Sequence, residues 1–300
     1  MHSRMTYRFL AIISLIAMPY ILRGQTEDVA MHFAAFPSDP VATVNGGLTS
    51  AYETGDMKSG IQAGYMLFFP TESPVSYISL KGSYKLNDSI CLSLNGTYGI
   101  CEEYEMFNGS GLSDGFYRPG QMMLAAGAEY RFINFMKAGI RLKYLTESLA
   151  PESRHNAFAS DIYLAGKVAL SSLSSIDFGL GINNLGTKVT SSSGSKFTLP
   201  TALNIHCGYG LNSDRNMIEA SVGADYFLHG RLAAAAGLSY TYNDFISARF
   251  GYRYGGESVL PSYCSAGLGF KFFGAELNLA YLFGSDVLSN SMCISLGYTF

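Results

Sequence analysis

The chain has 300 residues, of which only 14% are charged, and a formal net charge of −3. Average soluble domains carry about 25% charged residues, and the chain shows no basic block or acidic tail, so nucleic acid is excluded as a partner. The aromatic residues are 21 Tyr and 20 Phe with no Trp, beside 33 Gly. Low charge with many Tyr, Phe and Gly is typical of a chain whose outer surface faces lipid.

The N-terminus has the pattern of a secretory signal. Arg4 and Arg8 precede an apolar run at 9–18, which is too short for a membrane helix of roughly 20 residues. We therefore predict a signal peptide over residues 1–24, cleaved after Gly24. A retained N-terminal anchor is the alternative.

Residues 25–60 have mixed character and form an N-terminal segment that could fold into a lumen as a hatch. From Ile61 onward, apolar residues alternate with polar or small ones in runs of about ten residues. In Ile90-Cys91-Leu92-Ser93-Leu94, for example, every second side chain is apolar. Successive side chains of a strand point to opposite faces, so each run has one apolar and one polar face.

This alternation fits a soluble sandwich or a membrane barrel. The apolar faces repeatedly end in Tyr or Phe, as at Tyr98, Tyr144 and Tyr226, which favours an outward apolar band with aromatic girdles. We therefore predict an all-β fold, a transmembrane antiparallel β-barrel of about 14 strands over residues 61–300. The predicted strands lie near 61–69, 75–86, 89–100, 121–132, 135–146, 158–170, 174–183, 200–211, 216–227, 231–242, 245–254, 262–273, 275–284 and 292–300.

The links between these strands alternate between short and long, as in membrane barrels with periplasmic turns and longer outer loops. One short outer link, near His229, interrupts the pattern. An even strand count places both chain ends on the periplasmic side. The predicted long outer links are 101–120, 147–157, 184–199, 255–261 and 285–291.

Few residues suggest chemistry. The five cysteines show no CxxC or CxxH pairing, and no His has metal-ligand spacing. The chain also lacks a Gly-x-Ser-x-Gly elbow, although a Ser-His-Asp arrangement is defined by geometry and stays open. We predict no catalytic residue, no metal and no cofactor, and therefore no enzyme.

Charged side chains of both signs fall on the predicted lumen face. They could pair with one another and fill the barrel, or they could line a polar pore. These residues are Glu129, Arg131, Lys137, Arg141, Lys143, Asp161, Lys167, Asp177, Glu219, Asp225, Arg249, Arg253, Lys271 and Glu276.

The link 101–120 combines acidic and aromatic residues. Aromatic side chains in an outer loop either pack down on the barrel or meet a partner, and both alternatives stay open. The candidate partner-binding residues in the outer links are Tyr104, Met106, Phe107, Phe116, Tyr117, Arg118, Leu149 and Lys188.

Several stretches together resemble a known family: 114–119, 138–144, 177–188, 197–201 and 288–296. In order and spacing they are similar to the PorV branch of the PorV/PorQ family, within the FadL-like fourteen-stranded barrels. The resemblance covers roughly residues 110–300. The chain departs from the family in its short link at 255–261 and in lacking a clear Asn-Pro-Ala motif near the N-terminus.

The resemblance implies a non-enzymatic role in type IX protein secretion in the outer membrane of a Gram-negative bacterium. The barrel would bind secreted proteins by their C-terminal sorting domains at the translocon. It would then pass them to a surface attachment complex that contains a sortase-like protease. The alternative, implied by the broader class, is a FadL-like transporter of hydrophobic small molecules across the outer membrane.

Overall fold

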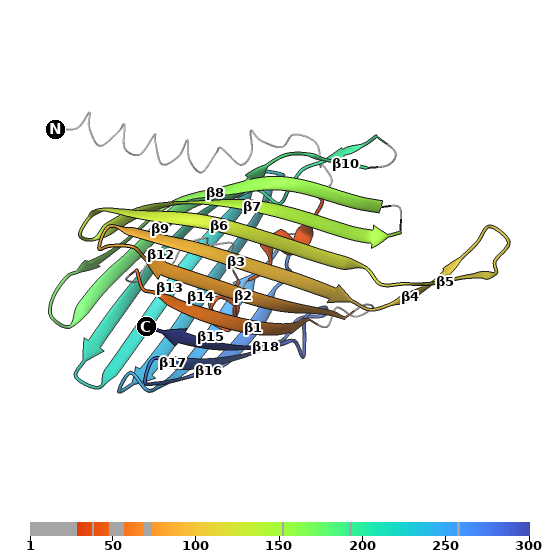
Figure 1. Ribbon diagram of the computed structural model, residues 1–300. Coiled ribbons are helices and arrows are strands. Elements are labelled where there is room, and N and C mark those ends of the chain that lie inside the picture. Colours follow the sequence, from red (N-terminus) through yellow and green to blue (C-terminus); the bar gives the residue numbers. More distant parts are fainter. Residues whose placement is uncertain are drawn as a thin grey trace, which may run out of the picture.

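The computed structural model describes residues 29–37, 39–47, 57–68, 74–151, 153–191, 194–256 and 259–300. Fourteen strands within these residues form one closed antiparallel barrel, which confirms the predicted fold (Figure 1). The predicted signal peptide over residues 1–24 lies outside the described residues.

Every predicted strand is present, and most boundaries shift by only one or two residues. The barrel strands are β1 (Gly60–Phe68), β2 (Val75–Lys85), β3 (Ile90–Cys101), β6 (Gly120–Ile133), β7 (Met136–Ala150), β8 (Ser153–Ala169), β9 (Ser174–Gly186), β12 (Ala202–Ser213), β13 (Asn216–Phe227), β14 (Arg231–Tyr242), β15 (Ile246–Tyr254), β16 (Tyr263–Phe272), β17 (Ala275–Phe283) and β18 (Met292–Thr299).

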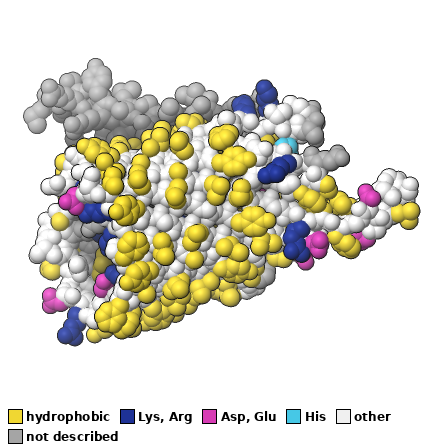
Figure 2. All heavy atoms as spheres, in the orientation of Figure 1, with side chains coloured by type: hydrophobic (Ala, Val, Ile, Leu, Met, Phe, Trp, Pro, Cys, Tyr) yellow, Lys and Arg dark blue, Asp and Glu magenta, His cyan; other side chains and the backbone are white. Residues whose placement is uncertain are grey.

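The barrel closes where β1 pairs with β18, from Gly60 opposite Thr299 to Leu67 opposite Met292. Neighbouring strands supply hydrogen bonds all around the wall, so no backbone edge faces the lipid. Alternation sorts the side chains as expected: Leu80 is 63% exposed, whereas its neighbour Ser79 is 4% exposed and faces the lumen. Apolar side chains cover the visible outer wall (Figure 2).

One end of the barrel carries the long links and the other carries tight turns; we call them the loop end and the turn end. Two of the predicted long loops are wrong in detail. The link 147–157 is mostly strand, because β7 continues to Ala150 and β8 begins at Ser153. The link 184–199 holds the end of β9 and the short strands β10 (Val189–Thr190) and β11 (Lys196–Phe197).

The link 101–120 forms a hairpin of its own, made of β4 (Tyr104–Phe107) and β5 (Ser113–Tyr117). This hairpin projects away from the loop end and extends farther than any other described part of the barrel (Figure 1). In long-loop barrels the loop end is the outer side of the membrane, so we take the hairpin as facing outward.

Residues 29–37 and 39–47, which we call the N-terminal segment, lie inside the barrel. They form the 3-10 helix η1 (His32–Ala35) and the α-helix α2 (Pro40–Val44). Helix α2 lies against β15, β16, β17 and β18. Neither helix has the length or the apolar character that crossing a bilayer requires, within the described residues.

Candidate functional site

Helix α2 is held at its start by a capped carboxylate. Asp39 is the N-cap residue: its Oδ1 accepts a 2.8 Å hydrogen bond from the Ala42 backbone N–H, and Pro40 follows in the first turn. The other oxygen of Asp39 accepts a hydrogen bond from the Lys81 ammonium on β2. Burial raises the pKa of Asp39, but Lys81 and the backbone donors outweigh it and hold that pKa below its ordinary value.

On the opposite wall, β15 and β16 bind the end of α2 through its backbone carbonyls. Nη1 of Arg253 donates to the carbonyls of Gly46 and Gly47, at 2.8 and 3.0 Å. The hydroxyl of Tyr263 donates to Thr43 O at 3.0 Å, and Ser265 donates to Val44 O at 2.9 Å. The carbonyls at a helix C-terminus have no partner within the helix, so the barrel wall supplies the donors.

Two glycines make this close approach possible. A Cβ added to Gly251 on β15 would lie 1.7 Å from the carbonyl oxygen of Val44, a distance no side chain tolerates. Gly46 has a φ of +89°, and a Cβ there would lie 2.2 Å from the Ala235 Cβ. The seat of α2 therefore depends on glycine on both sides of the contact.

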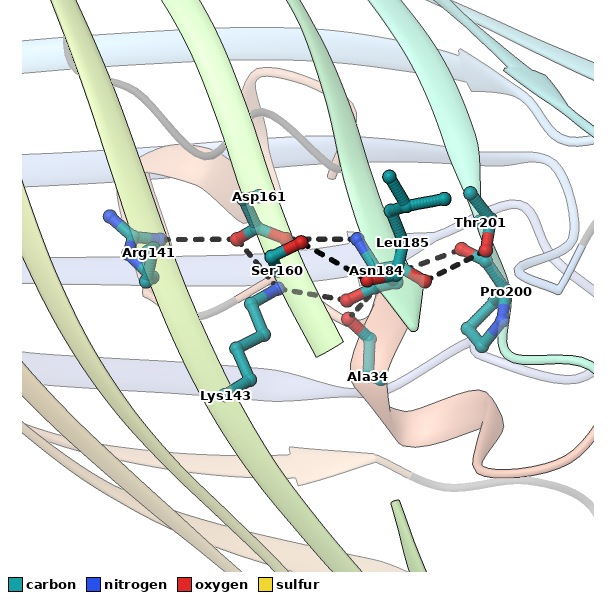
Figure 3. A network of polar contacts seen from close by, with 9 residues as sticks. All are labelled: Ala34, Arg141, Lys143, Ser160, Asp161, Asn184, Leu185, Pro200 and Thr201. Carbon is teal, nitrogen blue, oxygen red and sulfur yellow. Dashed lines mark hydrogen bonds and ion pairs between the residues drawn. The ribbon is translucent and has the colours of Figure 1, made fainter. Parts of the chain in front are cut away.

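A buried polar network ties the other wall to η1 (Figure 3). Asn184 on β9 donates from Nδ2 to the carbonyls of Ala34 and Pro200, both at 3.2 Å, and its Oδ1 accepts from Lys143 at 2.8 Å. Its backbone N–H donates to Asp161 at 2.9 Å. Every polar group of the Asn184 side chain is thus hydrogen-bonded.

Asp161 is the charged centre of this network. It is fully buried and forms an ion pair with the Lys143 ammonium at 2.7 Å, while Nη1 of Arg141 lies 3.9 Å away. Removing one partner from such a buried pair leaves an uncompensated charge, which costs about 3–5 kcal/mol. The network therefore fixes the position of the wall beneath η1.

The lumen is apolar on the loop side of the N-terminal segment. Met31 and Phe33 pack there into one cluster with wall residues such as Phe68, Leu145 and Leu282. The two-residue alternation identifies the lumen face, but it does not show where along the barrel that face changes from polar to apolar.

On the turn side the lumen is polar and open. A cavity of about 700 Å³ lies there, roofed by residues of the N-terminal segment such as Pro37 and Asn45. Several of its charges are paired within the wall: Lys137 Nζ lies 2.9 Å from Glu129, and Lys143 Nζ lies 2.7 Å from Asp161. Of the two alternatives for the lumen charges, these contacts favour ion pairing.

The structure gathers six of the eight candidate partner-binding residues on the β4–β5 hairpin. The rings of Tyr104 and Tyr117 meet edge to face at 5.9 Å, and Arg118 lies 3.5 Å from Glu103. Phe107 and Phe116 are exposed by 64% and 66%. The hairpin therefore presents aromatic side chains to solvent.

Tyrosine hydroxyls also dock the hairpin on β7. Tyr104 donates to the carbonyl of Leu149 at 2.8 Å, which brings that seventh candidate beside the hairpin. Tyr117 lies 2.7 Å from the Ser148 hydroxyl. Lys188, the eighth candidate, is exposed beside β10, on a different link.

The sequence did not predict which wall residues contact the N-terminal segment. Arg253 and Asn184 belong to strands with ordinary alternation, and only their place on the lumen face was predictable. Within the described part of the chain, no group of three or more His, Cys, Asp or Glu side chains is placed to hold a metal ion.

No protein-family model matches the chain, and no curated protein matches its sequence. Its fold is similar to that of the Ralstonia pickettii toluene transporter TbuX, with a TM-score of 0.54 at 10% identity over 89% of this chain and 99% of that one. The Pseudomonas putida toluene transporter TodX gives 0.52 at 13% identity over 92% and 99%. CymD, a monoaromatic hydrocarbon channel, gives 0.51 at 12% identity over 88% and 97%. The chain therefore has a FadL-like fold.

Proposed function

We propose that the chain is a non-enzymatic outer-membrane channel for small apolar molecules, closed by its N-terminal segment. The observation that carries the proposal is the apolar cluster inside the lumen at the loop end. The interior of a membrane barrel is usually polar. Apolar side chains there give an apolar solute a favourable place to leave water.

Such a molecule would meet an apolar and a polar part of the lumen along the barrel. The cluster lies at the loop end and includes Met31 and Phe33 of the N-terminal segment, and the polar cavity opens at the turn end. Passage requires the segment to shift, because the carbonyls of Thr43, Val44, Gly46 and Gly47 are hydrogen-bonded to the wall. The similarity in fold to toluene and monoaromatic hydrocarbon channels supports this substrate class.

The test is uptake of radiolabelled toluene by cells that carry the chain in their outer membrane. Leu145→Asn places an unpaired amide in the apolar cluster, so we expect uptake to fall about tenfold or more. Deletion of residues 105–115, at the hairpin, serves as the matched control and leaves uptake unchanged. Uptake equal to that of cells without the chain would refute the proposal.

The projecting hairpin favours a second function, the one that the PorV resemblance implies. Phe107, Leu112 and Phe116 are each more than 60% exposed, and aromatic residues in that position are typical of partner contacts. In this function the barrel receives secreted proteins by their C-terminal sorting domains. It delivers them to an attachment complex with a sortase-like protease.

The two functions are separated by the same pair of variants. A pull-down from detergent-solubilised outer membrane should recover secreted proteins with the intact chain and with Leu145→Asn. The hairpin deletion should lose them. Recovery that is equal with and without the hairpin contradicts the second function and leaves the first untouched.

A further inference from the structure

Three asparagines lie together on the lumen face of two adjacent strands: Asn183 and Asn184 on β9, and Asn204 on β12. In the register, Asn183 is opposite Ala202 and Asn204 is opposite Gly181. All three are at most 3% exposed. On the β9 side Asn204 thus faces a residue without a side chain, whereas on the β13 side it lies opposite the buried Asp225.

The three amides differ in their hydrogen bonds. Asn184 is saturated by Lys143, Ala34 and Pro200. Neither Nδ2 nor Oδ1 of Asn204 has a partner among the described residues, and the same is true of Oδ1 of Asn183. Buried polar groups are nearly always hydrogen-bonded, so the two amides require an explanation that Asn184 does not.

Both amides line the 700 Å³ cavity, which is open at the turn end beside Lys58, Gly60 and Thr299. A cavity of this volume lies within the range of pockets that hold small molecules, about 300–1,000 Å³. The amides therefore sit deep in a cavity that a ligand can enter from the turn end.

Most of the lysines that line the cavity are already matched by carboxylates. Lys81, Lys137 and Lys143 each have a carboxylate partner within the protein, and Arg141 shares Asp161 with Lys143. The groups without a partner are two acceptor oxygens, Oδ1 of Asn183 and Oδ1 of Asn204, and one donor, Nδ2 of Asn204. A hydroxyl group both donates and accepts, so vicinal hydroxyls match this set.

We propose that Asn183 and Asn204 form a binding site for a small neutral polyhydroxylated molecule, of the size of a mono- or disaccharide, reached from the turn end. The site extends toward His206, which is paired with Asp177 at 2.7 Å and lines the same cavity. It is separate from the apolar cluster, so it stands whether or not the barrel conducts apolar molecules.

The test is isothermal titration of the purified full chain with glucose and with maltose. The detergent must have no sugar headgroup, because such a headgroup would compete for the site. We expect saturable binding of at least one of the two sugars. Each of Asn183→Ala and Asn204→Ala removes hydrogen bonds to the ligand and weakens binding about tenfold.

Asn95→Ala is the matched control, since Asn95 lines the same cavity from β3. It should leave the affinity unchanged. Folding of each variant is verified by heat-modifiable migration in a gel. The proposal is overturned if the unmodified chain binds neither sugar, a result that depends on no variant. It is also overturned if Asn95→Ala weakens binding as much as Asn204→Ala.

Discussion

The side-chain nitrogen of Asn184 donates a 3.2 Å hydrogen bond to the carbonyl of Ala34, joining the barrel wall to the N-terminal segment. The same side chain accepts from Lys143, which neutralises Asp161. One residue thus connects the position of the segment to a buried charge network.

Asn184→Ala should loosen the N-terminal segment. It removes the bonds to Ala34, Pro200 and Lys143 and leaves buried partners unsatisfied, at a cost of about 1–3 kcal/mol each. We expect more frequent channel openings in planar lipid bilayers and a lower unfolding temperature. Asn95→Ala, on β3, is the control and should conduct like the unmodified chain. Equal conductance for both variants would contradict a latching role for Asn184.

Gly251→Ala should unseat helix α2. Its Cβ would meet the Val44 carbonyl at 1.7 Å, and both groups are backbone-fixed. We expect a protease added from the turn side to cut rapidly within residues 39–47. We also expect the conductance to rise. The control is Gly82→Ala, because a Cβ on Gly82 meets nothing within 4 Å. If both variants resist protease as the unmodified chain does, the close approach is not what seats the helix.

The Asp39–Lys81 pair predicts a dependence on acid. The folded pKa of Asp39 lies below its ordinary value, so the pair stabilises the seated segment above the unfolded pKa. This stabilisation is lost as pH falls through the folded pKa, below about pH 4. Conductance measured from pH 7 to pH 2 should rise in that acid range. Asp39→Asn should conduct more than the unmodified chain at neutral pH, and its conductance should not rise further in acid. If the acid rise persists in this variant, a group other than Asp39 causes it.

Leu145→Ala should destabilise the barrel from inside. Leu145 is fully buried in the apolar cluster, and truncating a buried Leu costs about 2–5 kcal/mol. The measurement is the temperature at which the folded band disappears in a detergent gel. Leu142→Ala is the matched control on the same strand, since Leu142 is 60% exposed on the outer wall. A smaller loss for Leu145→Ala than for Leu142→Ala would show that the cluster is loosely packed.

Tyr104→Phe combined with Tyr117→Phe should free the hairpin from β7. The change removes the hydroxyl contacts to Leu149 and Ser148, each contributing about 0.5–1.5 kcal/mol. Limited proteolysis should then cut within residues 102–118 sooner. The control is Tyr130→Phe, on the outer wall, which the protease should cut at the same rate as the unmodified chain. Unchanged cutting in the double variant would mean that the ring contacts alone hold the hairpin.

The barrel was predictable because its signal is repeated in every strand. Alternation places Leu80 outside and Ser79 inside, and the link lengths fix the strand count. Strand ends at the loop side were less predictable: β7 and β8 continue as a paired ribbon through 147–157, where the sequence loses its apolar alternation. Pairing between neighbouring strands does not need an apolar face, so strands extend beyond the point where the pattern ends.

The candidate site was predictable only in part. A lumen-facing place for Arg253 and Asp161 follows from alternation, but their partners come from the N-terminal segment and from strands distant in sequence. Contacts such as Arg253 to the Gly46 carbonyl depend on backbone positions, which no side-chain pattern reports. Alternation gives the face on which a residue lies but not the depth at which the lumen becomes apolar, so the pattern alone does not place the apolar stretch.

The seam between β1 and β18 has a consequence for the order of folding. Gly60 pairs with Thr299, and the backbone N–H of Phe300 donates to Ser59, so the first and last strands meet only after every strand between them is available. Contacts between residues far apart in sequence form slowly. We therefore expect ring closure to be the final step of assembly, with the N-terminal segment enclosed at that moment rather than threaded in afterwards.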